Sequence, residues 1–393
     1  MSHQTTPTIY TLQFGLLCLS SLLFSASFNM IIPELPNYLS SLGGGEHKGL
    51  IIALFTLTAG ISRPFSGKLT DQWGRVPVMA VGSIVCVLCG FLYPILSSLA
   101  GFFILRLVHG FSTGFKPTST SAYIADIIPS NRWAEALGMH GLCFSIGGAI
   151  GPAIGSYIAL RHGIDAMFYS SSAFAFVSIV IVYHMKETLQ QRQAFSTKMM
   201  HISKSEIIEV RVIPAAIVTL LSYTAYGVIL TLVPDWSEHM GIANKGLFFT
   251  VYTGASIAIR LLSGKAADRY GRIKVMLVGI VITGASLLIL GLWTDIEGLL
   301  VGACVYGIGT GILSPALNAW TIDLSLPQYR GKAMATMYIA LEAGIGGGAL
   351  LSGYIYHDYI FRIPGILIGN ALIIFVALLY ILYWKRRNDT VKL

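Results

Sequence analysis

The stretch G-K-L-T-D-Q-W-G-R, residues Gly67 to Arg75, decides the fold because the chain contains it twice. The second copy is G-K-A-A-D-R-Y-G-R, residues Gly264 to Arg272, in which the glycines, the lysine, the aspartate and the last arginine recur at an offset of 197 residues. The same offset carries Asp126 onto Asp323. A repeat of about half the chain length is typical of a duplicated membrane fold whose halves face each other across a pathway. The sequence therefore predicts a transporter.

The composition places the chain in a membrane. Hydrophobic residues make up 54% of the sequence and charged residues only 11%, whereas a soluble domain carries about 25% charge. The formal net charge of +8 does not indicate a nucleic-acid partner, because most Lys and Arg stand in short segments between apolar runs, where they orient a membrane protein. The five cysteines lie inside apolar runs, so we expect neither a disulfide framework nor a metal site.

Polar and glycine-rich breaks divide the chain into twelve apolar spans, each long enough to cross about 30 Å of hydrocarbon. The predicted spans are 10–39, 49–67, 76–97, 101–127, 134–160, 164–186, 208–235, 244–264, 273–293, 298–324, 332–356 and 360–384. We interpret the polar segment 187–207 as a cytoplasmic linker between an N-terminal six-helix bundle, 1–186, and a C-terminal six-helix bundle, 208–393. The first span has no Lys or Arg before it and no small-residue cleavage site, so we expect a membrane helix rather than a removable signal peptide.

The distribution of Lys and Arg predicts the orientation. With both termini in the cytoplasm, the inner loops and tails hold most of the basic residues, and Arg63 and Arg260 lie at the inner membrane edge. The outer loops then hold only Lys48, Arg161, Lys245 and Arg362. This bias predicts a multi-pass protein of the inner membrane with cytoplasmic termini.

Lys116 is a candidate substrate-binding cation. It stands halfway between Arg106 and Asp126, which bracket the span 101–127 by roughly 30 Å of helix rise, so it lies near the bilayer midplane. On a helix, His109 stands about 20° from Lys116 and Arg106 about 80°, so the three share a face. Because a buried ammonium costs several kcal/mol unless it meets water or a counter-ion, we expect that face to line the central cavity. A lysine that snorkels to the interface is the structural alternative, but about 15 Å separates it from either interface.

Glu342 is the expected counter-charge of Lys116 and the candidate proton carrier. It lies near the middle of the span 332–356, where a carboxyl group can bind and release a proton. The alternative is a purely structural ion pair with a basic residue. Glu34, closer to the outer end of the first span, is either functional or simply interfacial.

Polar and aromatic residues on other spans can shape a pocket for an organic molecule. Tyr223 and Tyr226 stand on the span 208–235, and Asn318 and Trp320 on the span 298–324. The alternative is ordinary helix packing, which is the commoner use of an aromatic residue at helical spacing.

Four motifs, in their expected order, resemble those of the major facilitator superfamily, and more narrowly its twelve-helix drug:proton antiporter branch. They are the repeated loop Gly67 to Arg75, the helix 1 motif Asn29 to Pro36, the arginine motif Arg106 to Gly114, and the antiporter motif Gly147 to Gly155. Some relatives carry an aspartate where Asn29 stands, and many carry a glutamine where His109 stands. The resemblance implies an all-α membrane protein of two pseudo-symmetric six-helix bundles that works by alternating access.

The resemblance also implies a cytoplasmic gate at the repeated loop. Glycines there allow a tight reversal, and Arg63, Arg75 and Arg132 are candidate partners for Asp71 and Asp126. In relatives such a cluster forms when the cavity opens outward and breaks when it opens inward; the alternative is that its charges only fix topology. The gating residues we expect are Gly67, Asp71, Gly74, Arg75, Asp126, Arg132, Asp268 and Arg272.

The glycines of the antiporter motif predict close helix packing. Gly147, Gly151 and Gly155 recur every four residues and form a smooth stripe for a neighbouring helix. Pro152 removes one backbone donor and can kink the helix. These packing roles do not depend on the family.

The sequence thus predicts a secondary active transporter that couples proton entry to the export of a small organic compound. A midplane lysine favours an anionic or zwitterionic compound over the lipophilic cations of multidrug pumps. The alternative is a proton symporter or facilitator for an organic anion or sugar. We expect a monomer in the lipid bilayer that binds protons and a small molecule, needs no cofactor beyond the proton gradient, and is not an enzyme, because no catalytic triad, metal cluster or phosphate loop is present.

Overall fold

The computed structural model describes residues 11–128, 133–202, 207–326 and 330–390. Within these residues all regular structure is helical, and twelve helices have 18 residues or more. The N-terminal half contributes α1 (Leu12–Met30), α3 (Lys48–Gln72), α4 (Arg75–Leu92), α5 (Leu99–Ile127), α6 (Trp133–His162) and α7 (Ile164–Tyr183). The C-terminal half contributes α9 (Ile213–His239), α10 (Leu247–Tyr270), α11 (Arg272–Leu292), α12 (Ile296–Leu324), α13 (Arg330–Tyr356) and α14 (Ile363–Thr390). The all-α, twelve-helix prediction is confirmed.

The first predicted span, 10–39, is broken near its end. α1 stops at Met30, the 3-10 helix η1 covers Ile32–Glu34, and the short helix α2 covers Leu35–Ser41. Pro33 explains the break, because a proline has no backbone N–H to donate to the preceding turn. The break leaves Glu34 buried at the junction.

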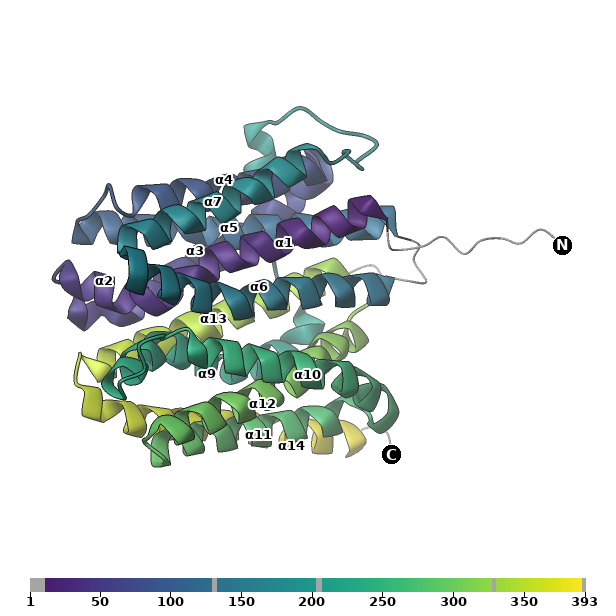
Figure 1. Cartoon of the computed structure of the whole chain (residues 1–393). Helices are drawn as coiled ribbons and strands as arrows, with labels where there is room; N and C mark the ends of the chain where they lie inside the picture. The colour runs from purple at the N-terminus through teal and green to yellow at the C-terminus, as the bar shows by residue number, and fades with distance from the viewer. Residues whose placement is uncertain (1–10, 129–132, 203–206, 327–329, 391–393) are drawn as a thin grey trace.

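The two halves form separate helix bundles, with α1 to α7 in the upper part of Figure 1 and α9 to α14 in the lower part. In the N-terminal half α1 packs against α6 and α7, and α5 against α3 and α4; in the C-terminal half α9 packs against α13 and α14, and α12 against α10 and α11. The halves meet along two helix pairs, α3 with α13 and α6 with α10. Each of these contacts has its counterpart under the internal repeat, so the halves are related by a pseudo-two-fold axis.

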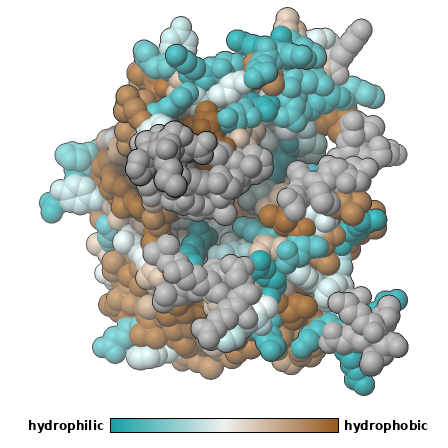
Figure 2. All heavy atoms as spheres, turned by 90° about the vertical axis from the view of Figure 1, so that its right-hand side faces the viewer, coloured by the Kyte–Doolittle hydropathy of each residue, from teal (hydrophilic) through white to brown (hydrophobic). Residues whose placement is uncertain are grey.

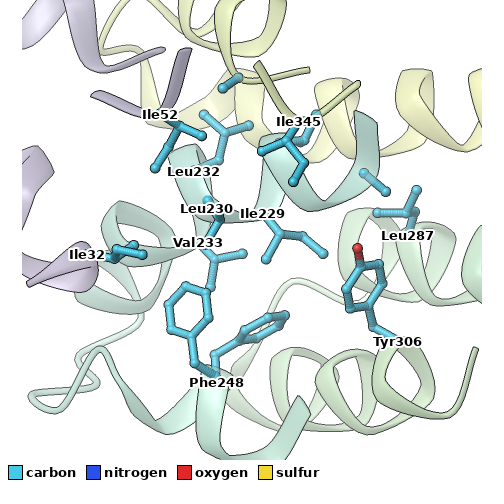
Figure 3. Close-up of a cluster of buried hydrophobic side chains, with 14 of the residues drawn as sticks. Ile32, Ile52, Ile229, Leu230, Leu232, Val233, Phe248, Leu287, Tyr306 and Ile345 are labelled. Atoms are coloured by element: carbon cyan, nitrogen blue, oxygen red, sulfur yellow. The ribbon is translucent and has the colours of Figure 1, made fainter. Parts of the chain in front are cut away.

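The chain begins and ends on one side of the molecule. α1 starts and α14 stops at the right of Figure 1, and we call this side the terminal end and the other side the opposite end. α9 runs to the opposite end, where Ile52 of α3 lies beside Leu232 of α9 in a buried cluster that also includes Ile32 of η1 (Figure 3). Apolar contacts therefore join the two halves near the opposite end.

The helices suit a membrane environment. Ten helical segments in the described residues are long and apolar enough to cross a bilayer. Of the other two long helices, α5 carries Arg106, His109 and Lys116 in its middle, and the apolar part of α10 ends at Arg260. Large apolar side chains such as Phe375 of α14 are exposed on the outer surface, as lipid-facing positions require. The chain is a multi-pass membrane protein.

The glycine stripe of α6 packs directly on α1. A Cβ atom added at Gly147, Gly151 or Gly155 would lie 2.3, 2.6 or 2.0 Å from a backbone oxygen of α1, those of Leu22, Ala26 and Met30 respectively. No larger side chain fits unless the helices separate.

Replacing Gly151 by leucine is expected to destabilise the protein, because the new side chain must push α6 away from α1. Overpacking of this kind costs about 1–3 kcal/mol, and a lower midpoint of thermal unfolding in detergent measures it. Gly365→Leu in α14 is the matched control, because a Cβ atom there meets nothing within 4 Å. Equal losses in the two variants would contradict the packing account.

Candidate functional site

Arg63 of α3 and Glu342 of α13 form an ion pair across the interface between the halves. Arg63 Nη2 donates to Glu342 Oε1 at 2.6 Å, and the side chains are only 13% and 9% exposed. The guanidinium carbon lies 4.8 Å from the ring centre of Tyr338, one turn before Glu342. Arg63 stands about 14 Å of helix rise before α3 ends at Gln72. The pair therefore lies within the interface between the halves, away from the end of α3.

Arg260 of α10 is the repeat counterpart of Arg63 and also reaches across the interface. Arg260 Nη1 donates to Ser145 Oγ of α6 at 3.1 Å. The offset of 197 residues carries Arg63 onto Arg260 and Ser145 onto Glu342, so the repeat relates the two contacts. The middle of the interface thus has the same arginine in both halves but different partners for it.

Lys48, at the start of α3, joins the halves at the opposite end. Its Nζ donates to Asp235 Oδ2 of α9 and to Asp358 Oδ1 after α13, both at 2.6 Å. The Tyr356 hydroxyl also donates to Asp235 Oδ2, at 2.8 Å. Asp358 has φ 61°, a conformation that aspartate tolerates better than most residues. Two carboxylates from the C-terminal half thus converge on one buried lysine of the N-terminal half.

Lys245, just before α10, makes the reciprocal contact. Its Nζ lies 2.9 Å from Glu238 Oε2 of its own half and 3.9 Å from Glu34 Oε2 of the N-terminal half. Ser156 Oγ donates to Glu34 Oε1 at 2.6 Å, and Asn37 Nδ2 donates to Glu238 Oε2 at 2.8 Å across the halves. Glu34 is therefore buried in an inter-half network.

The two lysine clusters are copies of one arrangement. The offset of 197 residues carries Lys48 onto Lys245; Pro33-Glu34 corresponds to Pro234-Asp235 only at an offset four residues larger, near the end of the first span in each half. Each lysine binds the acid that belongs to the other half. The crossed pairs therefore close the interface at the opposite end with pseudo-two-fold symmetry.

The helix backbones meet at the same place. A Cβ atom added at Gly49 would lie 2.4 Å from the backbone oxygen of Ala349. A Cβ atom at its repeat counterpart Gly246 would lie 2.4 Å from the backbone oxygen of Pro152. These approaches bring α3 onto α13 and α10 onto α6, so the opposite end is closed by backbone contact as well as by charge.

The structure overturns the expected position of Lys116. Its Nζ donates to Ser20 Oγ of α1 at 2.9 Å and to Ser178 Oγ of α7, and lies 4.8 Å from the ring centre of Phe24. The side chain is therefore enclosed within the N-terminal bundle rather than at the interface. Glu342 pairs with Arg63 and not with Lys116, so the predicted pairing was wrong. The argument for an anionic substrate that rested on Lys116 falls with it.

Arg106 and His109 also point into the N-terminal bundle. Arg106 Nε donates to the backbone oxygen of Ile51 at 2.7 Å, and its guanidinium carbon lies 4.7 Å from the Phe55 ring centre. His109 Nε2 lies 3.3 Å from Cys86 Sγ of α4. Helical spacing placed the three residues on one face of α5, but that face meets neighbouring helices of its own bundle instead of a central cavity.

Arg75 organises a charged cluster at the terminal end. Its Nε donates to Asp126 Oδ2 and its Nη1 to Asp71 Oδ1, both at 3.0 Å. The Glu187 carboxylate accepts the backbone N–H groups of Arg75 and Val76, each at 3.0 Å, and so caps α4 at its positive end. These partners belong to the N-terminal half and the linker. The expected pairs of Arg75 with Asp71 and Asp126 are present, and they close one half upon itself; the gating role of this cluster stays a prediction.

Some of the other expected gating residues lie in a turn, some lie in a helix, and some lie outside the described residues. Gly74 has φ 136°, and a Cβ atom there would lie 2.5 Å from Glu187 Oε2, so it serves the reversal as expected. Gly67 lies inside α3 and not in a reversal. Arg272 Nε lies 3.4 Å from Asp323 Oδ2, the repeat of the Arg75 contact. Arg132 and the side chain of Asp268 lie outside the described residues.

The expected pocket residues are scattered. Asn29 is half-buried and donates to the backbone oxygen of Ser25 in its own helix, at 2.8 Å. The Tyr226 ring lies 6.0 Å from that of Tyr252 on α10, and Asn318 is half-buried on α12. Trp320 packs against Trp384 of α14 with 5.0 Å between ring centres, which is in the C-terminal bundle.

Several residues of the interface escaped the sequence analysis. Lys48 and Lys245 are expected only as outer-loop charges and Arg260 only as a charge at the inner edge, while the partners expected for Arg63 are Asp71 and Asp126 rather than Glu342. The signal in the sequence is that Lys48 recurs as Lys245 and Arg63 as Arg260 at the repeat offset, although Lys48 precedes the predicted span 49–67. Among the described residues no cluster of metal-binding side chains occurs.

Comparison with known proteins agrees with the fold. A family model described as the Major Facilitator Superfamily matches residues 17–214 and again 215–392. Multidrug resistance protein 2 of Bacillus subtilis (strain 168) is 27% identical over 384 residues, covering 93% of both chains. Multidrug resistance protein MdtG of Salmonella arizonae is 24% identical over 95% of this chain and 96% of its own. The multi-drug resistance efflux pump PmrA homolog of Lactococcus lactis subsp. lactis is 26% identical over 90% of both chains.

Solved transporter structures share the architecture. The human organic anion transporter MFSD10 (TETRAN) superposes with a TM-score of 0.74 at 16% identity, over 94% of this chain and 98% of that one. A POT family transporter in complex with 5-aminolevulinic acid gives a TM-score of 0.77 at 12% identity, over 94% and 96%. At such identities the likeness concerns the fold alone.

Replacing Lys48 by methionine is expected to destabilise the protein more than replacing Lys245. Lys48→Met leaves the buried Asp235 without its cation, a loss of about 3–5 kcal/mol. Lys245→Met should cost less, because its closer partner Glu238 is 54% exposed and its inter-half partner is 3.9 Å away. The midpoints of thermal unfolding in detergent measure the two losses of stability. Lys48→Arg is the control that retains the charge, and a larger loss in Lys245→Met would refute the ranking.

Proposed function

Because the chain belongs to the major facilitator superfamily, a family of membrane transporters rather than enzymes, we propose that it exports a small organic compound in exchange for protons. It works by alternating access, with the binding region between the two bundles. The proton gradient is its energy source, no cofactor is required, and the unit is a monomer. The multidrug names of the relatives from Bacillus, Salmonella and Lactococcus favour export of organic compounds.

The ion pair between Arg63 and Glu342 carries this proposal. It holds α3 of one half to α13 of the other, in surroundings where both side chains are largely shielded from water. A proton on Glu342 removes the negative charge and so weakens the hold on the arginine. Breaking a buried pair by removal of one charge costs several kcal/mol, which is enough to shift an equilibrium between two conformations.

The shape of the molecule supports an alternating mechanism. The crossed pairs of Lys48 and Lys245 close the opposite end. Figure 2 faces the terminal end and shows a hollow with hydrophilic side chains between the two halves. In this conformation the interface is reached from the terminal end. The converse conformation requires the crossed pairs at the opposite end to separate.

The movements of proton and substrate are coupled when the ion pair acts as a lock, that is, when the intact pair prevents the change of conformation. With Glu342 ionised and no substrate bound, the pair holds the conformation closed at the opposite end. A proton on Glu342, or a substrate that competes for the interface charges, weakens this lock and permits the change. A ligand shifts such an equilibrium only through its different affinity for the two states. Each change of conformation then carries either a proton or a substrate across the membrane, which is antiport.

The orientation makes this exchange an export. The positive-inside bias favours a cytoplasmic terminal end in the inner membrane, so the hollow accepts substrate from the cytoplasm. Protons reach Glu342 from the opposite, external side after the conformational change and leave on the cytoplasmic side.

Glu342→Gln is expected to abolish proton coupling, because glutamine cannot exchange a proton and does not hold Arg63 by charge. The test uses inverted membrane vesicles with an acid interior and a panel of cationic, zwitterionic and anionic aromatic compounds. Wild-type vesicles should lose interior acidity when a substrate is added, and Glu342→Gln vesicles should not. Glu297→Gln, which removes an exposed carboxylate at the start of α12, is the matched control.

Two outcomes would overturn the proposal. Unchanged pH-dependent transport in Glu342→Gln removes Glu342 as the proton carrier. Acidification instead of proton loss on substrate addition means that proton and substrate move together, as in a symporter.

A further inference from the structure

The N-terminal half has an apolar groove near the terminal end that the linker fills. Five side chains of α3, α4 and α5 form this groove: Leu69, Trp73, Val78, Val81 and Phe115. Met199, from the short 3-10 helix η4 (Thr197–Met200) of the linker, packs among them and is only 5% exposed. The Phe195 ring, also of the linker, lies 5.5 Å from the Trp73 ring. The linker therefore supplies the apolar contacts that this groove needs.

In the C-terminal half the equivalent groove is open. The offset of 197 residues carries the five groove residues onto Ala266, Tyr270, Val275, Val278 and Ile312. All five line a groove of about 320 Å³, together with Ile259 and Lys274. Tyr270 and Val278 are 59% and 52% exposed, so the groove opens on the outer surface. The place that Met199 fills in one half is therefore accessible in the other.

The open groove has the length of one membrane leaflet. Along α10 it extends from Ile259 to Tyr270, where the helix ends, which is about 16 Å of helix rise. Half of a hydrocarbon core of about 30 Å is about 15 Å. Apart from the ammonium group of Lys274 and the hydroxyl group of Tyr270, the side chains that line the groove are apolar. An apolar groove on the outer surface of a membrane-spanning helix pair meets lipid.

Positive charge gathers at the terminal end of the open groove. Lys274 is exposed there, where the N-terminal half carries Pro77. The segment 265–274 contains four basic residues and one acidic residue, whereas its counterpart 68–77 contains two basic residues and one acidic residue. Tyr270 suits the level of the lipid head groups, where tyrosine is enriched. The half whose groove is open thus has the additional positive charge that attracts an anionic head group.

We infer that this groove binds an anionic phospholipid. One acyl chain lies along Ile259, Val278 and Ile312. It takes the place that the unbranched side chain of Met199 takes in the other half. The phosphate of the head group accepts from Lys274 Nζ. The inference goes beyond the proposed transport function and takes from it only the cytoplasmic position of the terminal end, which puts this lipid in the inner leaflet.

The first test measures lipid binding to the purified, delipidated protein in detergent by native mass spectrometry. The probes are palmitoyl-oleoyl phosphatidylglycerol and the phosphatidylcholine with the same two chains. The wild type should bind phosphatidylglycerol about fivefold more tightly, the effect expected of one lysine near an anionic head group. Lys274→Gln should lose this preference, whereas Lys186→Gln, at an exposed position after α7, should keep it. Equal binding of the two lipids by the wild type, or an unchanged preference in Lys274→Gln, would overturn the inference.

The second test fills the groove. Val278→Trp should weaken the binding of phosphatidylglycerol several-fold, because the indole ring occupies the space that the acyl chain needs. Val376→Trp, at an exposed position of α14 that does not line the groove, is the matched control and should bind as the wild type does. If Val278→Trp does not fold, Ala266→Leu, which installs the side chain of Leu69, takes its place with the same expected loss. Undiminished binding in the folded variant would contradict the inference.

The same spectra identify a different occupant of the groove. A dimer that Val278→Trp dissociates would mean that a second copy of the chain covers the groove, and it would overturn the inference. Failure of the transport proposal is a separate outcome. If phosphatidylglycerol binds as expected but no compound moves protons in vesicles, the lipid site stands and the exchange mechanism fails.

Discussion

The structure depends above all on one charge contact, the ion pair of Arg63 and Glu342 midway along the interface of the two bundles. A guanidinium and a carboxylate that are largely removed from water must remain paired, because either alone is costly in such surroundings. The pair therefore holds α3 against α13 while Glu342 is ionised. A single proton changes this balance, which connects a local titration to the relative position of two whole bundles.

The two halves make equivalent contacts at the opposite end of the interface but different contacts at its centre. At the opposite end, Lys48 and Lys245 each cross to an acid of the other half, with close glycine contacts beside them. At the centre the arginines are kept, but Ser145 replaces the carboxylate of Glu342. Symmetric contacts suit a closure that both halves must make together. The asymmetric centre gives one arginine a carboxylate partner and the other a hydroxyl partner.

Much of the fold was predictable from the sequence, and much of the site was not. The repeat and the apolar spans gave twelve helices, and the spacing of Gly147, Gly151 and Gly155 gave a packing stripe, because both depend on local periodicity. Lys116 was misplaced for a physical reason: periodicity shows which residues share a helix face but not which helix that face meets. Its partners Ser20 and Ser178 come from α1 and α7, far away in sequence. The recurrence of Arg63 as Arg260 is visible in the sequence, but it does not show that both side chains lie at the interface between the halves.

The most direct test of the central claim is the pH dependence of the distance between the halves at the opposite end. Spin labels at the repeat-related, exposed positions Ser97 and Thr294, in a protein without its five native cysteines, report that distance by pulsed electron paramagnetic resonance. The wild type should show a short distance at alkaline pH and a growing population of longer distances at acid pH. Glu342→Gln should show the longer distances at both. A pH response in Glu342→Gln equal to that of the wild type would contradict the claim that a proton on Glu342 releases the interface.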